Sequence, residues 1–136
     1  MSIIYRYGAE EADFDRLLEL LRTTYWFGER TPEQYRVALR NSFCVSAWDG
    51  ERMVGFARLV TDYALHAYLG DVIVDPGLRG QGIGRTLVRK LVEHECVRTC
   101  TITLHTRDAL GVYEPLGFNR RESLVKPRRG GWVRLG

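Results

Sequence analysis

Residues 67–91 read AYLGDVIVDPGLRGQGIGRTLVRKL, and this stretch decides the fold of the chain. It begins with apolar and β-branched residues that are typical of a strand. Asp75-Pro76-Gly77 ends that strand, because proline lacks an N–H donor and Asp and Gly favour turns. Three glycines then lead into a segment with one apolar helical face, formed by Ile83, Leu87, Val88, Leu91 and Val92. The stretch therefore predicts a strand, a glycine-rich loop and a helix in succession.

The glycine-rich loop has the features of an anion-binding site. Gly80, Gly82 and Gly84 let the backbone approach a ligand closely. They stand where the first N–H groups of a helix have no partner within the helix. These free donors and the positive end of the helix dipole favour a phosphate group. The loop therefore predicts a ligand that carries phosphate.

Two common phosphate-binding motifs are excluded by the residues that follow the loop. A Walker A loop requires Lys and then Ser or Thr after its last glycine, but Arg85 and Thr86 follow Gly84. The dinucleotide fingerprint requires a third glycine three residues after the second, and counted from Gly82 that position is Arg85. The loop is then either another kind of phosphate site or a glycine-rich turn without a ligand.

Two motifs together point to one family. Arg79, Gly82 and Gly84 match the pattern Arg/Gln-x-x-Gly-x-Gly/Ala. Further along, TRDALGVYEPLGF at 106–118 places Tyr113 three residues before Leu-Gly-Phe. In these motifs and in their order the chain resembles the GCN5-related N-acetyltransferase (GNAT) superfamily, as a small, bacterial-type, single-domain member. The first pattern is the acyl-CoA pyrophosphate loop of that superfamily, and the second is its closing helix.

The hydrophobic periodicity predicts strands and helices along nearly the whole chain. The run 31–34, Thr-Pro-Glu-Gln, predicts a capped helix, and Asp49-Gly50 predicts a hairpin turn. The expected strands are 3–7, 43–48, 52–61, 67–74, 101–105, 121–125 and 131–135, and the expected helices are 9–24, 32–41, 83–92 and 107–115. We expect an α/β (α+β) fold whose mixed, mostly antiparallel central sheet has about six or seven strands and helices on both faces. The resemblance implies the same GNAT-like fold.

The composition is that of one globular domain, expected to cover residues 1–136. Hydrophobic residues make up 45% and charged residues 27% of the chain, which are ordinary values for a protein with one core. The first residues turn acidic without an apolar signal core, and no apolar run reaches the roughly 18 residues of a membrane span. We therefore expect a cytoplasmic monomer or homodimer with no membrane contact. Its three cysteines, Cys44, Cys96 and Cys100, are expected to be free thiols, and no metal site is expected.

Positive charge is concentrated at the C-terminal end. Six arginines and lysines after residue 118 oppose one acid, Glu122, whereas the whole chain carries a net charge of +3. Such a tail can bind nucleic acid, but Trp132 is its one aromatic residue and no known nucleic-acid module accompanies it. We expect a solvated segment, or a surface that faces an anionic ligand, and no nucleic-acid partner.

The resemblance implies that acetyl-CoA is the co-substrate, and it assigns the binding residues by position. The backbone N–H groups of 79–84 would hold the pyrophosphate, with Arg79 or Arg85 adding positive charge. Strand residues 72–74 would bind the pantetheine arm, and one N–H group of that strand would polarise the thioester carbonyl. The implied cofactor-binding residues are Val72, Ile73, Val74, Arg79, Gly80, Gln81, Gly82, Ile83, Gly84, Arg85 and Thr106.

The same resemblance makes Tyr113 the general acid that protonates the departing thiolate. The alternative for Tyr113 is an aromatic core residue. Two positions depart from the family pattern. Thr106 stands where many members have Asn, although its hydroxyl can cap the helix and still bond a ligand. Leu110 stands where a small bacterial subgroup has His, so any role of that imidazole is absent here.

The acceptor side offers less specific signals. An acceptor ammonium must lose a proton before it attacks, and a carboxylate can accept that proton directly or through water. Asp71 on the central strand is the candidate base, with Asp62 and His105 as rivals. A β-bulge near Asp71 would change the face on which its side chain lies. The aromatic residues Tyr25, Trp26 and Phe27 either line the acceptor pocket or cover the core.

These observations favour an N-acetyltransferase that moves an acetyl group from acetyl-CoA to a primary amine of a small molecule or peptide. The amine would attack directly in a ternary complex, because no cysteine or serine stands in a nucleophilic arrangement. The alternative is a non-catalytic acyl-CoA-binding sensor or interaction module. A nucleic-acid-binding domain is a third possibility and would require steeply salt-dependent binding.

Overall fold

The computed structural model describes residues 2–135, which divide into two compact units with the boundary between His105 and Thr106. The first unit contains β1 (Ile3–Tyr7), α1 (Phe14–Leu21), α2 (Pro32–Arg40), β2 (Ser42–Asp49), β3 (Arg52–Thr61), β4 (His66–Val74), α3 (Ile83–Val92) and β5 (Thr101–Thr103). Short 3-10 turns at Ala9–Glu11, Pro76–Leu78 and Glu95–Val97 join some of these elements. The second unit contains α4 (Leu110–Tyr113) and a 3-10 turn, Glu114–Leu116. That the whole chain acts as one domain stays a prediction.

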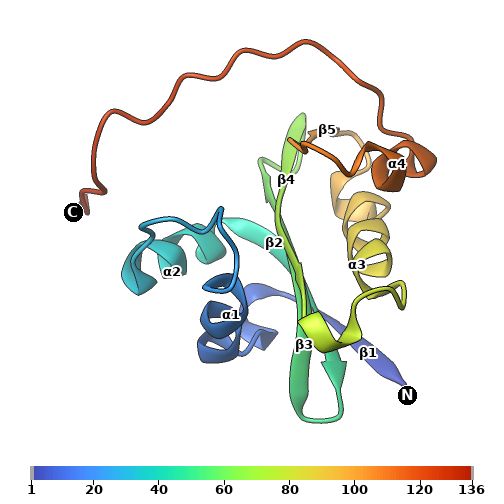
Figure 1. Ribbon diagram of the computed structural model, residues 1–136. Coiled ribbons are helices and arrows are strands. Elements are labelled where there is room, and N and C mark those ends of the chain that lie inside the picture. The colour runs from blue at the N-terminus through green and yellow to red at the C-terminus, as the bar shows by residue number, and fades with distance from the viewer. Residues whose placement is uncertain (1, 136) are drawn as a thin grey trace. The chain divides into compact units, whose positions relative to one another are not determined.

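The strands of the first unit form one sheet in the order β1-β2-β3-β4-β5 (Figure 1). Neighbouring strands are antiparallel except for β4 and β5, which are parallel. This confirms the predicted mixed, mostly antiparallel sheet. The β2–β3 hairpin turns where it was expected, since Asp49 pairs with Arg52 and Gly50 adopts a left-handed φ of +61°.

The sheet lacks the last two expected strands, so the predicted strand number is wrong. Within the described residues 119–135 there is neither a helix nor a strand. A strand pair needs an apolar face to bury, and this segment offers few apolar side chains, of which Leu124 and Leu135 remain almost fully exposed. Pro127 and the adjacent glycines at 130–131 further disfavour strand pairing.

Helices cover both faces of the sheet, as predicted: α1 and α2 lie on one side and α3 on the other (Figure 1). The first helix is shorter than expected. It begins at Phe14 because the Asp13 carboxylate accepts the Arg16 N–H group at 3.2 Å and so caps it there. The predicted cap of α2 is confirmed, since the Thr31 hydroxyl accepts the Gln34 N–H group at 3.1 Å.

The core between α1, α2 and the sheet combines aliphatic and aromatic side chains. Its largest fully buried side chains there are Leu17, Leu21, Tyr35, Met53 and Phe56. On the other side of the sheet Leu87, Val88 and Leu91 of α3 are equally buried. Each such side chain contributes about 1.5–3 kcal/mol through removal from water, which makes the sheet a firm support for the loops at its edges. No helix within residues 2–135 has the length and apolar character that crossing a membrane requires.

The central strand β4 has two irregularities that bear on the site. Phe56 pairs with Ile73 and Arg58 pairs with Gly70, so β4 contains one extra residue and forms a bulge. Asp71 in this bulge has a left-handed φ of +53°. The parallel neighbour β5 pairs only with His66–Tyr68, at the start of β4. Among the described residues no strand pairs with that side of β4 from residue 69 to residue 74, and this open edge suits a ligand that binds like an added strand.

Candidate active site

The loop after β4 forms an open backbone cradle. Gly80 and Gly82 have left-handed φ angles of +82° and +84°, conformations that other residues rarely adopt. A Cβ atom placed on either glycine would meet no atom within 4 Å. The two glycines are therefore needed for the backbone path, and the space beside them is open. Gly84 differs, since a Cβ atom there would make ordinary contact with the Val74 side chain at 3.5 Å.

The cradle ends at the N-terminus of α3. Gly82 is the N-cap residue, and no side chain caps this end of the helix. The Gly82 carbonyl accepts the Thr86 N–H group at 3.0 Å and the Thr86 hydroxyl at 2.9 Å, which begins the helical hydrogen bonding. The first N–H groups of α3 thus lack the side-chain acceptor that Ser, Thr or Asp would supply, and an anion can take that place. The cradle, the dipole and the neighbouring Arg79 and Arg85 fit the pyrophosphate of acetyl-CoA.

Asp75 fastens this loop to the body of the first unit. Its carboxylate accepts the Gly77 N–H group at 2.8 Å and forms an ion pair with Arg16 of α1. Arg52 lies 3.6 Å from the same carboxylate. The hydrogen bond from Gly77 and the two arginines hold the pKa of Asp75 below its ordinary value. Because Arg16 also donates to the Met53 carbonyl at 3.1 Å, it ties the loop to both α1 and β3.

The strand residues 72–74 follow the bulge with alternating environments. Ile73 is buried in the core beneath α1 and α2, whereas Val72 and Val74 are half-buried. Their backbone lies on the open edge of β4, where the parallel strand β5 no longer pairs. This edge and the cradle follow one another directly along the chain.

Asp71, the predicted base, is almost completely enclosed. Its side chain is 3% exposed and accepts hydrogen bonds from three donors. Arg30 donates to Oδ1 at 2.9 Å, while Arg58 Nε and the Tyr35 hydroxyl donate to Oδ2 at 2.5 and 2.8 Å. We call these four residues the Asp71 cluster. Arg58 also donates to the Ser42 hydroxyl at 3.1 Å, which extends the cluster to the first residue of β2.

The cluster is held in a charged state by its own members. Burial by itself raises the pKa of Asp71, but the charges and hydrogen bonds of Arg58 and Arg30 outweigh it, and the net pKa is lowered. Burial and the neighbouring carboxylate raise the pKa of Tyr35, so its hydroxyl remains a donor. Burial lowers the pKa of Arg58, but Asp71 more than offsets this and the net pKa is raised. Burial also raises the pKa of Cys44 to about 12, so that this thiol stays neutral.

The two rivals for the base occupy different surroundings. The Asp62 carboxylate accepts the N–H groups of Ala64, Leu65 and His66 at 2.9, 2.8 and 3.1 Å, and these bonds lower its pKa to about 2. This carboxylate therefore shapes the turn before β4. The His105 ring packs against Tyr68, with ring centroids 5.5 Å apart.

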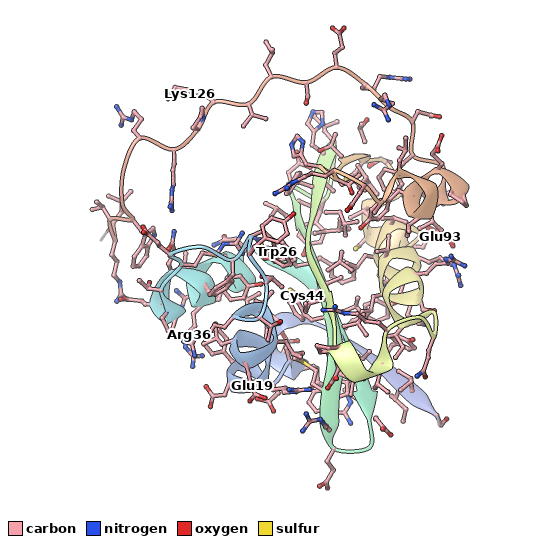
Figure 2. The ribbon with its side chains drawn as sticks, viewed as in Figure 1. Glu19, Trp26, Arg36, Cys44, Glu93 and Lys126 are labelled. Atoms are coloured by element: carbon pink, nitrogen blue, oxygen red, sulfur yellow. The ribbon has the colours of Figure 1, made fainter. Side chains whose placement is uncertain are left out.

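The three aromatic residues 25–27 between α1 and α2 differ in how far they are buried. Phe27 is buried and packs edge-on against Tyr35 at 5.8 Å, so it covers the core. Trp26 lies in the loop that joins α1 to α2 (Figure 2). It is 36% exposed, and Tyr25 is 75% exposed. Tyr25 and Trp26 therefore lie at the surface, whereas Phe27 belongs to the core.

The second unit contains the remaining predicted residues. The Thr106 hydroxyl accepts the Ala109 N–H group at 3.1 Å and so closes the turn before α4. The expected helix cap by Thr106 is wrong, because the N-cap residue of α4 is Ala109 and no side chain caps that helix. The helix itself, α4, is only four residues long, shorter than expected. Tyr113 at its end is half-buried, contacts the Phe118 ring edge-on at 5.9 Å, and has a pKa raised by burial. Burial thus keeps the Tyr113 hydroxyl protonated.

The sequence of this chain matches the model of one protein family. The model of the acetyltransferase (GNAT) family matches residues 14–118, which include the β4 edge, the cradle and Tyr113. The chain belongs to the GNAT family. A GNAT-family protein from Streptococcus pneumoniae has the same fold with a TM-score of 0.78 and 25% identity, over 95% of this chain and 100% of that one. A Xanthomonas campestris protein assigned to the GNAT family gives a TM-score of 0.86 at 28% identity, over 95% and 94% of the two chains.

Curated plant proteins are also similar in sequence. GCN5-related N-acetyltransferase 2, chloroplastic, from Arabidopsis thaliana is 47% identical over 148 residues, and histone acetyltransferase TAP1 from Glycine max is 31% identical over 139 residues. Both matches cover 92% of this chain. They cover only 57% and 59% of those two proteins, so this GNAT chain spans little more than half the length of these relatives.

Several residues of the site were missed by sequence reasoning. Arg30 has polar neighbours along the chain, and Arg16 lies at a polar position of the α1 pattern, so neither gives a local signal of a distant carboxylate. Arg58 is different, because a charged residue inside the apolar run 52–61 indicates a buried charge that needs a partner. That signal could have paired Arg58 with Asp71, which interrupts the next strand in the same way.

Proposed function

We propose that this GNAT chain is an N-acetyltransferase that moves an acetyl group from acetyl-CoA to a primary amine of a small molecule or peptide. The observation that supports it most is the cradle, in which two left-handed glycines face open space at an uncapped helix N-terminus. A glycine-rich turn without a ligand would give no reason for this arrangement. The open edge of β4 beside it suits an extended arm.

Most of the predicted residues have a role in this proposal, whereas Phe27 belongs to the core. Acetyl-CoA supplies an acyl thioester, whose carbonyl an N–H group of β4 would polarise. The N–H groups of 79–84 would hold the pyrophosphate, with Arg79 or Arg85 adding charge and the Thr106 hydroxyl bonding the cofactor. The Tyr113 hydroxyl would give its proton to the sulfur as the C–S bond breaks, and the amine nitrogen would form the new C–N bond. The proton lost from the ammonium would pass to a base.

Asp71 stays the predicted base by its position on β4, but its chemistry is unfavourable for that role. A carboxylate with a lowered pKa is a weak proton acceptor, and Asp71 already accepts three hydrogen bonds. Asp62 is similarly engaged. A water molecule held by backbone carbonyls near β4 is a further route for the proton.

The acceptor class is the open part of the proposal. Tyr25 and Trp26 would line the acceptor side, since both are exposed and both belong to the loop that carries Arg30 of the Asp71 cluster. Two relatives give a reason to test two kinds of amine. One is named a histone acetyltransferase and another, from rice, serotonin N-acetyltransferase 2, with 33% identity over 99 residues.

We expect the cytoplasmic location and the absence of nucleic-acid partners to hold for this chain, whether monomer or homodimer.

A panel of amines tests the proposal against its alternative. Lysine peptides, arylalkylamines, polyamines and amino acids would each be incubated with acetyl-CoA and the protein, and free thiol would be followed. Release of thiol above the rate without protein, for at least one amine, supports the enzyme. Saturable binding of acetyl-CoA without thiol release for any amine would favour the non-catalytic sensor. Binding of nucleic acid by the protein, with an affinity that falls steeply as salt is raised, would support the third possibility, a nucleic-acid-binding domain.

A further inference from the structure

The Asp71 cluster joins three separate parts of the first unit at one carboxylate. Arg30 comes from the loop 22–31 between α1 and α2, Tyr35 from α2, and Arg58 from β3. Both carboxylate oxygens are engaged, Oδ1 by Arg30 and Oδ2 by the other two. A carboxylate that is shared among three elements restrains all of them relative to the strand that carries it.

That strand is at its most irregular point there. Asp71 has a φ of +53° inside the β4 bulge, a left-handed conformation that is unfavourable for a residue other than glycine. Such a conformation persists where the surroundings fix it. The three hydrogen bonds to the Asp71 side chain are the interactions that can offset this cost, so the carboxylate holds the bulge in place.

The cluster also holds the loop 22–31 against the sheet. The Arg30 guanidinium lies over the rings of Phe27 and Tyr35, at 5.5 and 5.7 Å from their centroids. Its side chain is 29% exposed, compared with 13% for Arg58 and 3% for Asp71. Arg30 is therefore the outermost member of the cluster, and it is the member that carries the loop with Tyr25 and Trp26.

We infer that Asp71 is a positioning residue, whose contact with Arg30 keeps the loop 22–31 and the β4 bulge in one fixed arrangement. The inference rests on the proposed function, in which the loop contacts the acceptor amine and the bulge lies beside the thioester. The Arg30–Asp71 ion pair then sets the distance between the two reactants. Asp71 acts through the backbone and through Arg30, and it exchanges no proton with the acceptor.

The substitution Arg30→Gln separates positioning from base catalysis by the kinetic quantity that changes, which is either the pH–rate profile or KM for the amine. If Asp71 were the base, loss of the Arg30 charge would raise its pKa, strengthen it as a base and move the rising limb of the pH–rate profile upward. If Asp71 positions the loop, the limb stays in place and KM for the amine rises, on the order of tenfold or more. Tyr35→Phe, which removes one donor and keeps the ring, should give a smaller effect in the same direction.

Hydrogen exchange tests the same inference without any enzyme activity. Amide exchange in residues 22–31 and around the bulge should become at least several-fold faster in Arg30→Gln. It should stay unchanged in the control Arg98→Gln, which removes an exposed arginine whose partner is Glu95 at 3.3 Å. Arg30→Lys, which keeps the charge, should restore part of the protection.

Two results would overturn the inference. One is unchanged exchange in the loop and the bulge of Arg30→Gln, and the other is a pH limb that moves upward in that variant while KM for the amine stays constant. If the wild-type protein acetylates no amine, the proposed function fails, but the exchange experiment still decides whether Arg30 and Asp71 hold the loop.

Discussion

The cradle can be tested with a pair of alanine substitutions that strain the backbone alike. Gly82 and Gly50 both have left-handed φ angles, +84° and +61°, and a Cβ atom on either would meet no protein atom within 4 Å. Gly82→Ala and Gly50→Ala therefore introduce no steric clash with the protein itself. Each should cost about 1–2 kcal/mol of unfolding free energy, because an L-residue is disfavoured in that conformation. The melting temperature should fall on the order of 5 °C in both variants.

The two variants should differ in their affinity for acetyl-CoA. The methyl group of Gly82→Ala would occupy the open space of the cradle, whereas Gly50 lies in the β2–β3 hairpin. Loss of one hydrogen bond to a charged phosphate costs about 1.5–3 kcal/mol, which corresponds to an affinity loss of about tenfold or more. Isothermal titration with acetyl-CoA and thermal unfolding would be measured on both variants and the wild type.

The comparison removes the effect of general destabilisation. We expect similar melting temperatures for Gly82→Ala and Gly50→Ala, with weakened acetyl-CoA binding only in the first. If both variants bind acetyl-CoA as the wild type does, the pyrophosphate does not lie in the cradle. If both lose affinity equally, the loss reports stability and the cradle is not specifically involved.

Three further predictions concern individual residues. Tyr113→Phe should lower kcat by roughly 10²–10⁴-fold with an unchanged Kd for acetyl-CoA, and full kcat with chemistry rate-limiting would remove the hydroxyl from the mechanism. The folded-state pKa of Asp71 is lowered, so the stability it contributes is present above the carboxyl's unfolded pKa and is lost as pH falls through the folded value. Asp71→Asn should therefore be less stable than the wild type at neutral pH and approach it in acid, and a constant difference in denaturant midpoint would contradict this. Arg16→Gln releases Asp75 from α1 and should weaken acetyl-CoA binding several-fold with an unchanged KM for the amine, which titration and kinetics would check.

Local chemistry made most of the fold predictable. The Thr31 cap, the turn at Gly50 and the glycines before α3 act through residues within a few positions of each other, and each formed as expected. The first helix shows the limit of this reasoning, since its apolar pattern extends back to Ala12, while the Asp13 side chain sets its actual start. The hairpin expected from strands 121–125 and 131–135 does not form, because residues of strand character do not pair stably without an apolar face to bury.

The sequence predicted the cradle of the candidate site but not the Asp71 cluster. The cradle is a contiguous motif, and its backbone angles follow from its glycines. The Asp71 cluster unites Arg30 and Asp71, which are 41 positions apart, through a bulge that the sequence permits but does not mark. Because such a contact depends on how β4 bends, position along the strand suggested a base where the structure places a carboxylate with three donors.

The central claim is that one chain holds acetyl-CoA and an amine together and passes the acetyl group directly between them. Initial rates measured over a matrix of acetyl-CoA and amine concentrations test it, with free thiol and acetylated amine both quantified. We predict equal amounts of the two products and double-reciprocal lines that intersect, as a ternary complex requires. Parallel lines would contradict the claim by revealing an acetylated enzyme, and saturable acetyl-CoA binding with no acetylated amine would contradict it by leaving only the sensor.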